Sequence, residues 1–239
     1  MLYYQISALQ LKTIADVLKD VLAECWFVFE PSKIHMTNVD PEKVVSVSLQ
    51  LQPTSDTYQC TTKFTFPFYI QTLYKVLRGV KPDDVAILKD GAGHSLCIDI
   101  LTNNVLRSSI TLQPLNDPFP TFLQQAHQYD AEYKLDAKEL YRVLHDLSAL
   151  SRKVCIHVNN QELKFTSEDE TGSAIMFTQT FPSTSTYNFQ GVYLIKYLEK
   201  FAKPNLAKDV FLLLHHRSPL TLVYRWEYGS LEMSIAPSK

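Results

Sequence analysis

The stretch DAKELYRVLHDL, residues 136–147, predicts an amphipathic helix and decides the fold of the second half of the chain. Its apolar side chains recur at helical spacing and would form one buried stripe: Leu140, Val143, Leu144 and Leu147. Asp136, followed three residues later by Glu139, is typical of a helix start, because both carboxylates can accept hydrogen bonds from unpaired backbone N–H groups there. A helix should therefore begin at about this aspartate.

Three more stretches carry apolar residues at the same spacing: Leu11-Ile14-Leu18-Val21-Leu22, Ile70-Leu73-Leu77 and Leu194-Leu198-Phe201. The last of these helices should stop at Pro204, which cannot continue a helix. Elsewhere β-branched and aromatic residues tend to alternate with polar ones, as in Val44–Leu51 and Leu220–Trp226, which is typical of half-buried strands. Strand should outweigh helix, so we expect an α+β fold.

A connector divides the chain near its middle. Residues 113–128 contain Pro114, Pro118 and Pro120 and show no steady period, which predicts an extended segment. Strands and two helices follow one another in the same order on each side of it. We therefore expect two similar domains of antiparallel sheets with two helices each, over residues 1–113 and 129–239, joined by a connector over 114–128.

Composition narrows the class of protein. The 239 residues are 46% hydrophobic and 20% charged, and the net charge is −2, so any basic surface must be local. No apolar run could span a membrane, and residues 1–6 lack a basic segment followed by an apolar core, so we expect a soluble, intracellular protein that is not secreted. Four scattered cysteines should be reduced core residues: Cys25, Cys60, Cys97 and Cys155.

The sequence offers no motif for catalysis. It contains no G-x-S-x-G, P-loop, H-E-x-x-H or Gly-rich dinucleotide pattern, and six glycines leave little material for a phosphate cradle. His215 and His216 are adjacent beside a predicted strand, so their side chains would point apart and could not easily share one metal. We therefore expect no enzyme, no catalytic residue, no metal and no cofactor.

The predicted helices carry polar or cationic ridges opposite their buried stripes. Three helices show them at i, i+4 and i+7: Gln71, Lys75 and Arg78; Lys138, Arg142 and His145; Lys196, Lys200 and Lys203. The first helix is weaker, with Lys12 and Lys19 flanking Asp16. Solvated helix faces often look like this, and acidic neighbours such as Glu139 and Glu199 dilute the charge. Four such helices in a slightly acidic chain nevertheless favour phosphate contact without base readout.

Short stretches in both halves are collinear with one known family. The first half contributes residues 18–26 (LKDVLAECW), Ile34-His35-Met36 and Val39-Asp40. The second half contributes Asp146-Leu147-Ser148, residues 163–167 (LKFTS), Tyr197-Leu198, Phe201-Ala202-Lys203, Pro219-Leu220 with Tyr224, and Ile235-Ala236-Pro237. In this order and spacing the chain resembles the proliferating cell nuclear antigen (PCNA) family over essentially its whole length.

The resemblance implies a head-to-tail homotrimer whose six similar domains close a ring, with the helices lining the hole and facing double-stranded DNA. Seven cations fall on positions where the family is basic: Lys12, Lys19, Lys75, Arg78, Arg142, Lys196 and Lys203. His145 replaces what is normally an arginine. This change would weaken the positive field, because a free imidazole is mostly uncharged near neutral pH.

Ring closure in the family pairs an edge strand of one subunit with an edge strand of its neighbour. The corresponding segments are residues 105–112 and 173–180, and their expected interface residues are Val105, Ile110, Leu112, Ala174, Met176 and Thr178. Open strand edges invite such partners, because pairing satisfies their backbone groups. Without the resemblance, both segments would be interpreted as ordinary internal strands.

Partner proteins of these clamps insert a short hydrophobic motif into a pocket beneath the connector. The corresponding residues are Val39, Val44, Phe119, Phe122, Leu123, Pro219, Ile235, Ala236 and Pro237. The alternative is that the connector's apolar side chains pack on the protein's own sheet. Ser234 and Lys43 depart from the family pattern, which suggests a divergent clamp from a virus or an early-branching eukaryote.

The implied function is that of a sliding DNA clamp, a polymerase processivity factor without chemistry of its own. Its partners would be double-stranded DNA of any sequence, a DNA polymerase, other proteins with clamp-binding motifs, a clamp loader ATPase and further copies of the chain, but no membrane. It would act in the nucleus, or in the host nucleus or viral replication site if viral. Two alternatives stay open: a subunit of a heterotrimeric checkpoint-type clamp, and a clamp-like polymerase or transcription accessory protein that forms no ring.

Overall fold

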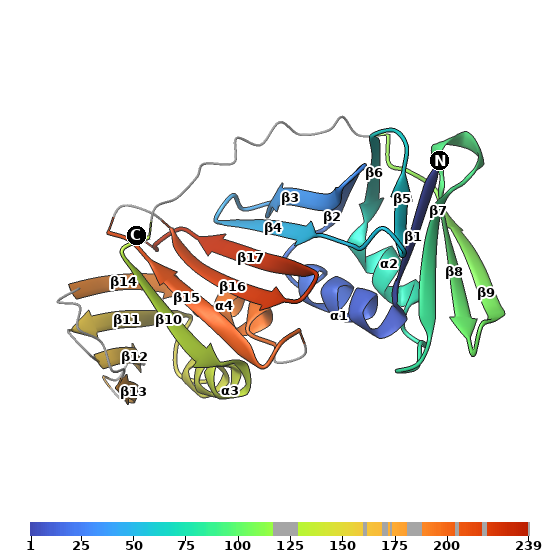
Figure 1. Cartoon of the computed structure of the whole chain (residues 1–239). Coiled ribbons are helices and arrows are strands. Elements are labelled where there is room, and N and C mark those ends of the chain that lie inside the picture. Colours follow the sequence, from blue (N-terminus) through green and yellow to red (C-terminus); the bar gives the residue numbers. More distant parts are fainter. Residues whose placement is uncertain are drawn as a thin grey trace. The chain divides into compact units, whose positions relative to one another are not determined.

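The computed structural model describes residues 1–116, 129–159, 162–168, 172, 174–180, 188–203, 206–216 and 219–238, and within 174–180 it describes only the side chain of Phe177. The chain divides into two compact units. Among the described residues, unit 1 comprises 1–41, 47–116 and 226–231, and unit 2 comprises 42–46, the described parts of 129–225, and 232–238. Figure 1 colours both units along the sequence.

Unit 1 is built from antiparallel strands and two helices. In chain order its elements are β1 (Leu2–Ser7), α1 (Ala8–Leu18), β2 (Glu24–Glu30), β3 (Lys33–Val39), β4 (Val45–Leu51), β5 (Tyr58–Cys60), β6 (Phe64–Tyr69), α2 (Ile70–Val76), β7 (Val85–Asp90), the 3₁₀ turn η1 (Ala92–His94), β8 (Leu96–Thr102) and β9 (Val105–Leu112). One sheet has the order β5-β1-β7-β8-β9, and β4, β3, β2 and β6 follow one another in a second. The strand β9 therefore lies at the edge of its sheet.

Unit 2 repeats the arrangement. Its elements are β10 (Ala131–Asp136), α3 (Ala137–Ser148), β11 (Lys153–Asn159), β12 (Glu162–Glu168), β13 (Ala174–Thr180), β14 (Asn188–Leu194), α4 (Ile195–Phe201), β15 (Asp209–Leu214), β16 (Leu220–Trp226) and β17 (Gly229–Ile235). A four-stranded sheet has the order β13-β12-β11-β14, and β10, β15, β16 and β17 follow one another in the other. The α+β fold with mostly antiparallel strands and few helices is confirmed, and β13 is an edge strand.

The helix α3 forms as its sequence predicts. The Asp136 side chain accepts hydrogen bonds from the backbone N–H groups of Lys138 at 2.9 Å and Glu139 at 3.0 Å, which satisfies two of the unpaired donors of the first turn. All four predicted stripe residues are buried, together with Ala137. The opposite side of α3 is therefore left to solvent.

The other helices are shorter than their apolar spacing suggests. The helices α2 and α4 end at Val76 and Phe201, so Arg78 and Lys203 lie beyond them, and the predicted i+7 position on these two helices is wrong. After α2 the chain closes through tighter three-residue turns, in which the Arg78 N–H donates to the Lys75 carbonyl at 3.3 Å. The helix α1 likewise ends at Leu18, before the buried Val21 and Leu22.

Aromatic side chains fill much of both cores. In unit 1, Phe27 meets Phe68 edge to face, with ring centroids 5.0 Å apart. In unit 2, Phe201 of α4 lies 5.6 Å from Tyr224 of β16, so the helix is fixed to the sheet beneath it. Figure 1 shows α3 and α4 together against this sheet.

Two of the four cysteines are core residues and two are not. Cys25 and Cys60 are buried, as predicted, whereas Cys97 and Cys155 are only half-buried, so the prediction for these two is wrong. Successive residues of a strand point to opposite faces, and Cys97 alternates with the buried Leu96 and Ile98. Its thiol instead lies beside Asp99 and Ser109 on the outward face.

The strand β14 contains a glycine that its neighbour requires. A Cβ atom at Gly191 would lie 2.7 Å from the ring of Tyr193, two residues further along the same face. Tyr193 is fully buried and has little room to move aside. Burial also raises the pKa of its hydroxyl to about 12, so this side chain stays neutral.

We predict that Gly191→Ala destabilises the protein by about 1–3 kcal/mol, because it overpacks the site beneath Tyr193. Urea unfolding followed by circular dichroism measures the change. Gly79→Ala is the matched control, since nothing lies within 4 Å of a Cβ atom added there and its φ is not positive. Equal stability of the two variants would contradict the packing argument.

Candidate nucleic-acid interface

The solvent-facing side of α3 and α4 carries most of the predicted cations of unit 2. The two helices contact each other, and their exposed residues include Lys138, Arg142 and His145 from α3 and Lys196 and Lys200 from α4. Lys203 follows α4 and is half-buried. The buried stripes leave these polar sides as the outer surface, so unit 2 brings the cations of two helices together on one side.

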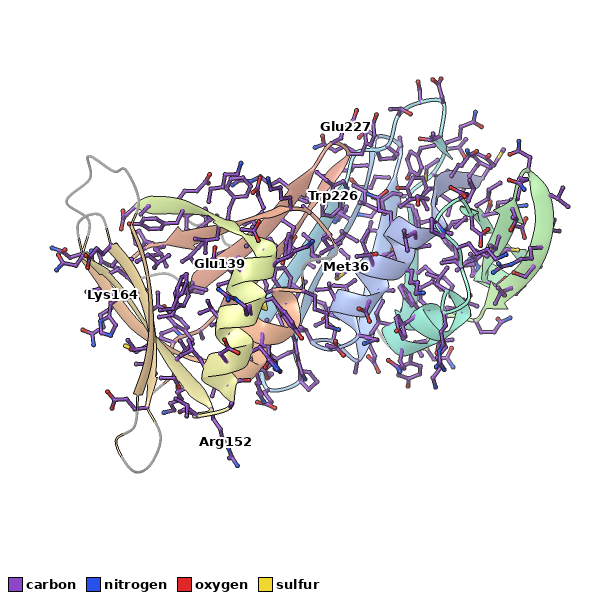
Figure 2. All side chains as sticks on the ribbon, turned by 90° about the horizontal axis from the view of Figure 1, so that it is seen from below. Met36, Glu139, Arg152, Lys164, Trp226 and Glu227 are labelled. Atoms are coloured by element: carbon purple, nitrogen blue, oxygen red, sulfur yellow. The ribbon has the colours of Figure 1, made fainter. Side chains whose placement is uncertain are left out.

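Several of these cations lie next to carboxylates. Arg142 Nη2 is 3.7 Å from Glu139 Oε1, one turn away on α3, where Figure 2 labels Glu139. Lys196 Nζ is 2.9 Å from Glu42 Oε1. Such exposed pairs contribute little stability, yet each partly cancels the positive field of its cation. The centre of this surface is therefore less basic than the sequence suggests.

His145 is part of the same pattern. Its Nδ1 lies 2.8 Å from Glu199 Oε1 of α4, and its ring stacks near that of Tyr141, with centroids 6.0 Å apart. The hydrogen bond to Glu199 raises the pKa of the imidazole. The sequence argument assumed a free imidazole, which does not hold here: His145 keeps its proton to higher pH, but beside a negative charge.

Lys138 differs from its neighbours on α3. It is exposed, near the start of the helix, and makes no ion pair within the part of the chain that the structure describes. Lys200 and Lys203 make further polar interactions of their own. Lys138 thus retains an uncompensated positive charge.

In unit 1 the lysine of α1 nearest to α2 is held inside the protein. The side chain of Lys19 is only 14% exposed, and its Nζ lies 3.0 Å from both Asp16 Oδ1 and Asp20 Oδ1. It also lies 4.6 Å from the ring centroid of Tyr74 on α2. Burial works to lower the pKa of Lys19, but its bonds to the two aspartates outweigh this and raise it. Lys19 therefore links two helices and sits in a cluster of net negative charge.

The remaining cations of unit 1 are more accessible. Lys75 and Arg78 are exposed and make no ion pair among the described residues. Lys12 Nζ donates to the Arg78 carbonyl at 2.9 Å, so it tethers α1 to the turn after α2 without losing its charge. The three residues place positive charge where the two helices end side by side.

The edge strand β9 exposes apolar side chains. Val105 is 69% exposed and Leu106, which the sequence analysis did not single out, is 57% exposed, whereas Ile110 is half-buried and Leu112 is buried. The signal for Leu106 was its place beside Val105 at the start of an edge strand. Two adjacent bare apolar residues on an unpaired strand edge are typical of a surface that another chain covers.

Arg107 fixes the start of β9. Its Nη1 lies 3.0 Å from Asp84 Oδ2, and its Nη2 donates to the Gly79 carbonyl at 3.1 Å. The side chain of Asp84 is fully buried, and the Thr102 hydroxyl and the Lys81 N–H donate to it as well. These bonds, with the charge of Arg107, lower the pKa of Asp84. The free edge of β9 is thus held in one position.

The predicted residues of β13 pair with β12, with Met176 opposite Thr166, Thr178 opposite Lys164 and Ala174 opposite Glu168. Their side chains lie outside the described residues. The backbone alone shows that the second expected pairing segment also ends a sheet.

Part of the predicted partner pocket can be placed. The Ala236 N–H donates to the Val44 carbonyl at 2.9 Å, which brings these two residues of unit 2 together. Ile235 is buried, Pro219 is half-buried and Pro237 is exposed, while Val39 is half-buried at the end of β3 in unit 1. Phe119, Phe122 and Leu123 lie outside the described residues.

The described residues contain no group of three or more His, Cys, Asp and Glu side chains that could hold a metal ion. His215 Nε2 lies 3.8 Å from Asp130 Oδ2, and His216 lies against the ring of Phe189 at 6.5 Å, so the two histidines have separate partners. Nor do the described helices include one long and apolar enough to cross a lipid bilayer.

Comparisons with known proteins agree with this architecture. The family model for the N-terminal domain of proliferating cell nuclear antigen matches residues 3–115, and that for its C-terminal domain matches residues 124–239. The proliferating cell nuclear antigen of Chaetomium thermophilum is 25% identical over 233 residues, which span 90% of this chain and 88% of that protein.

A viral protein is also similar. The probable DNA polymerase sliding clamp 1 of Paramecium bursaria Chlorella virus 1 is 23% identical over 242 residues, spanning 95% of this chain and 92% of that protein. The crystal structure of proliferating cellular nuclear antigen from Entamoeba histolytica has the same fold, with a TM-score of 0.90 and 21% identity over 100% of this chain and 99% of that one. With family models matched in both halves, the chain belongs to the proliferating cell nuclear antigen family.

Proposed function

We propose that the chain is a sliding DNA clamp: three copies form a closed ring around duplex DNA and hold a DNA polymerase at its template. The observation that carries the proposal is the match of the family models over residues 3–115 and 124–239. A relative of similar length bears the name of a polymerase sliding clamp, which supports the same function. The proposal assigns no reaction to the chain.

The mechanism is topological. Exposed cations on the helices, such as Lys75, Arg78 and Lys138, contact phosphates of any sequence, because they displace condensed counterions rather than read bases. Each contact is weak and exchanges with the next phosphate, so the ring moves along the duplex. The closed ring, not the affinity of these contacts, prevents escape.

Partner proteins dock on the surface around Val44 and Ala236, where a short hydrophobic motif adds to the apolar C-terminal segment. The polymerase and other proteins with such motifs are its ligands, and a loader ATPase opens the ring. The clamp works where replication takes place, in the nucleus or, for a viral protein, at the viral replication site.

The central test is retention on DNA of different topology. We predict that the loaded protein stays on nicked circular plasmid through gel filtration and leaves the same plasmid once it is made linear, because it slides off free ends. Equal retention on both forms would indicate ordinary DNA binding, and retention on neither would exclude a clamp.

A second prediction concerns the cationic side chains. Lys75→Glu combined with Lys196→Glu should abolish stimulation of processive synthesis and leave the assembly intact, because the reversed charges repel phosphates. Primer extension on a long circular template measures the effect. Lys33→Glu with Lys134→Glu changes the net charge equally on exposed strand residues and should keep full stimulation. Unchanged stimulation by the first pair would refute a DNA-facing role.

A third prediction concerns ring closure through β9. Val105→Asp with Leu106→Asp should convert a trimer of 27.4 kDa chains into monomers, because it places charge on an apolar edge that a neighbour covers. Light scattering after size exclusion measures the mass. Tyr228→Asp, at a side chain 46% exposed in the β16–β17 turn, should remain trimeric. A trimeric double variant would exclude pairing through β9, and a monomeric wild type would favour the heterotrimeric alternative.

A further inference from the structure

The pairing of cations with carboxylates leaves few uncompensated positive charges on the helix side of unit 2. Arg142, His145 and Lys196 each lie beside a glutamate. Two exposed cations near α3 make no ion pair within the described residues: Lys138 at its start and Arg152 just beyond its end. Arg152 belongs to none of the predicted ridges.

The position of Arg152 continues the line of α3. It follows His145 by seven residues and Lys138 by fourteen, which at 100° per residue would place it about 40° from Lys138 around the helix axis. The chain stays coiled after Ser148, because the N–H groups of Leu150 and Ser151 both donate to the Leu147 carbonyl, at 3.1 and 3.3 Å. Figure 2 shows Arg152 reaching away from the protein past the end of α3.

The backbone of Arg152 is fixed between two helices. Its carbonyl accepts a hydrogen bond of 3.0 Å from the N–H of Ile195, the first residue of α4. The guanidinium is therefore carried by an anchored residue, although the side chain itself is exposed. An anchored backbone reduces the conformational freedom that is lost when the side chain binds a ligand.

An open cleft of about 590 Å³ lies beside this arginine. Its lining comprises the turn after α3 and the end of β12: Ser148, Ala149, Leu150, Ser151, Arg152, Lys153 and Glu168. Two features oppose an anion here, the carboxylate of Glu168 and the negative end of the α3 dipole. Lys153 offsets the charge of Glu168, which leaves Arg152 to oppose the helix end.

We propose that Arg152 is a DNA phosphate contact of this clamp and, together with Lys138, supplies the contacts at the two ends of α3 while the paired cations between them contribute little. The inference rests on the proposed function. Arginine suits the role because its planar guanidinium can donate two parallel hydrogen bonds to one phosphate. Unit 2 then touches the duplex at two separated points rather than along a continuous ridge.

The salt dependence of DNA binding tests this assignment. The probe is a fluorescent duplex of random sequence, titrated with the trimer at several NaCl concentrations and followed by anisotropy. Arg152→Ala should lower the slope of log K against log salt by about 1, as expected for loss of one phosphate contact. Arg152→Lys, which keeps the charge, should restore most of the slope.

Arg225→Ala is the matched control. Arg225 is an exposed arginine of unit 2 whose guanidinium pairs with Glu132 at 3.0 and 3.1 Å. It alternates with the buried Tyr224, which contacts α4, so it lies on the sheet face away from the helices. Its removal changes the net charge equally and should leave the slope unchanged.

The outcomes separate the two proposals. If the wild type is retained on circular DNA but Arg152→Ala has the wild-type slope, the assignment of Arg152 is wrong and the clamp function stands. An equal drop with Arg225→Ala would also overturn it, because the effect would then reflect net charge alone. If the wild type is not retained on circular DNA, the clamp function fails and this inference fails with it.

Discussion

Each unit hides one side of two short helices against its own strands, and the exposed surface follows from that burial. In α3 the stripe from Leu140 to Leu147 is buried, so Lys138 and Arg142 have only the solvent side available. In α1 the same holds for Leu11, Ile14 and Leu18. The placement of charge is thus a consequence of apolar packing, without any dedicated binding motif.

The exposed charge is nevertheless not simply the sum of the lysines and arginines. Lys19 is absorbed into contacts with Asp16, Asp20 and Tyr74, and His145 shares its hydrogen bond with Glu199. These contacts join α1 to α2 and α3 to α4, so they order the helices while they reduce the field. A protein that must hold DNA loosely enough to move along it gains from such partial neutralisation.

The sequence predicted the elements better than their ends or their partners. Asp136 and the α3 stripe follow from local spacing, and their prediction is confirmed. Arg78 and Lys203 were placed on helices that end earlier, because Leu77 and Ala202 close them without a glycine or proline to mark the spot. Glu42 and Glu199 lie 154 and 54 residues from the cations they pair with, and only the fold brings them there.

The two open strand edges have a consequence for the chain on its own. Val105 and Leu106 stand bare at the rim of one sheet, and β13 ends another. In a chain whose copies associate through such rims, folding and association are linked equilibria, so the melting temperature rises with the amount of protein present. Dilution would then loosen each molecule as well as separate it from its neighbours.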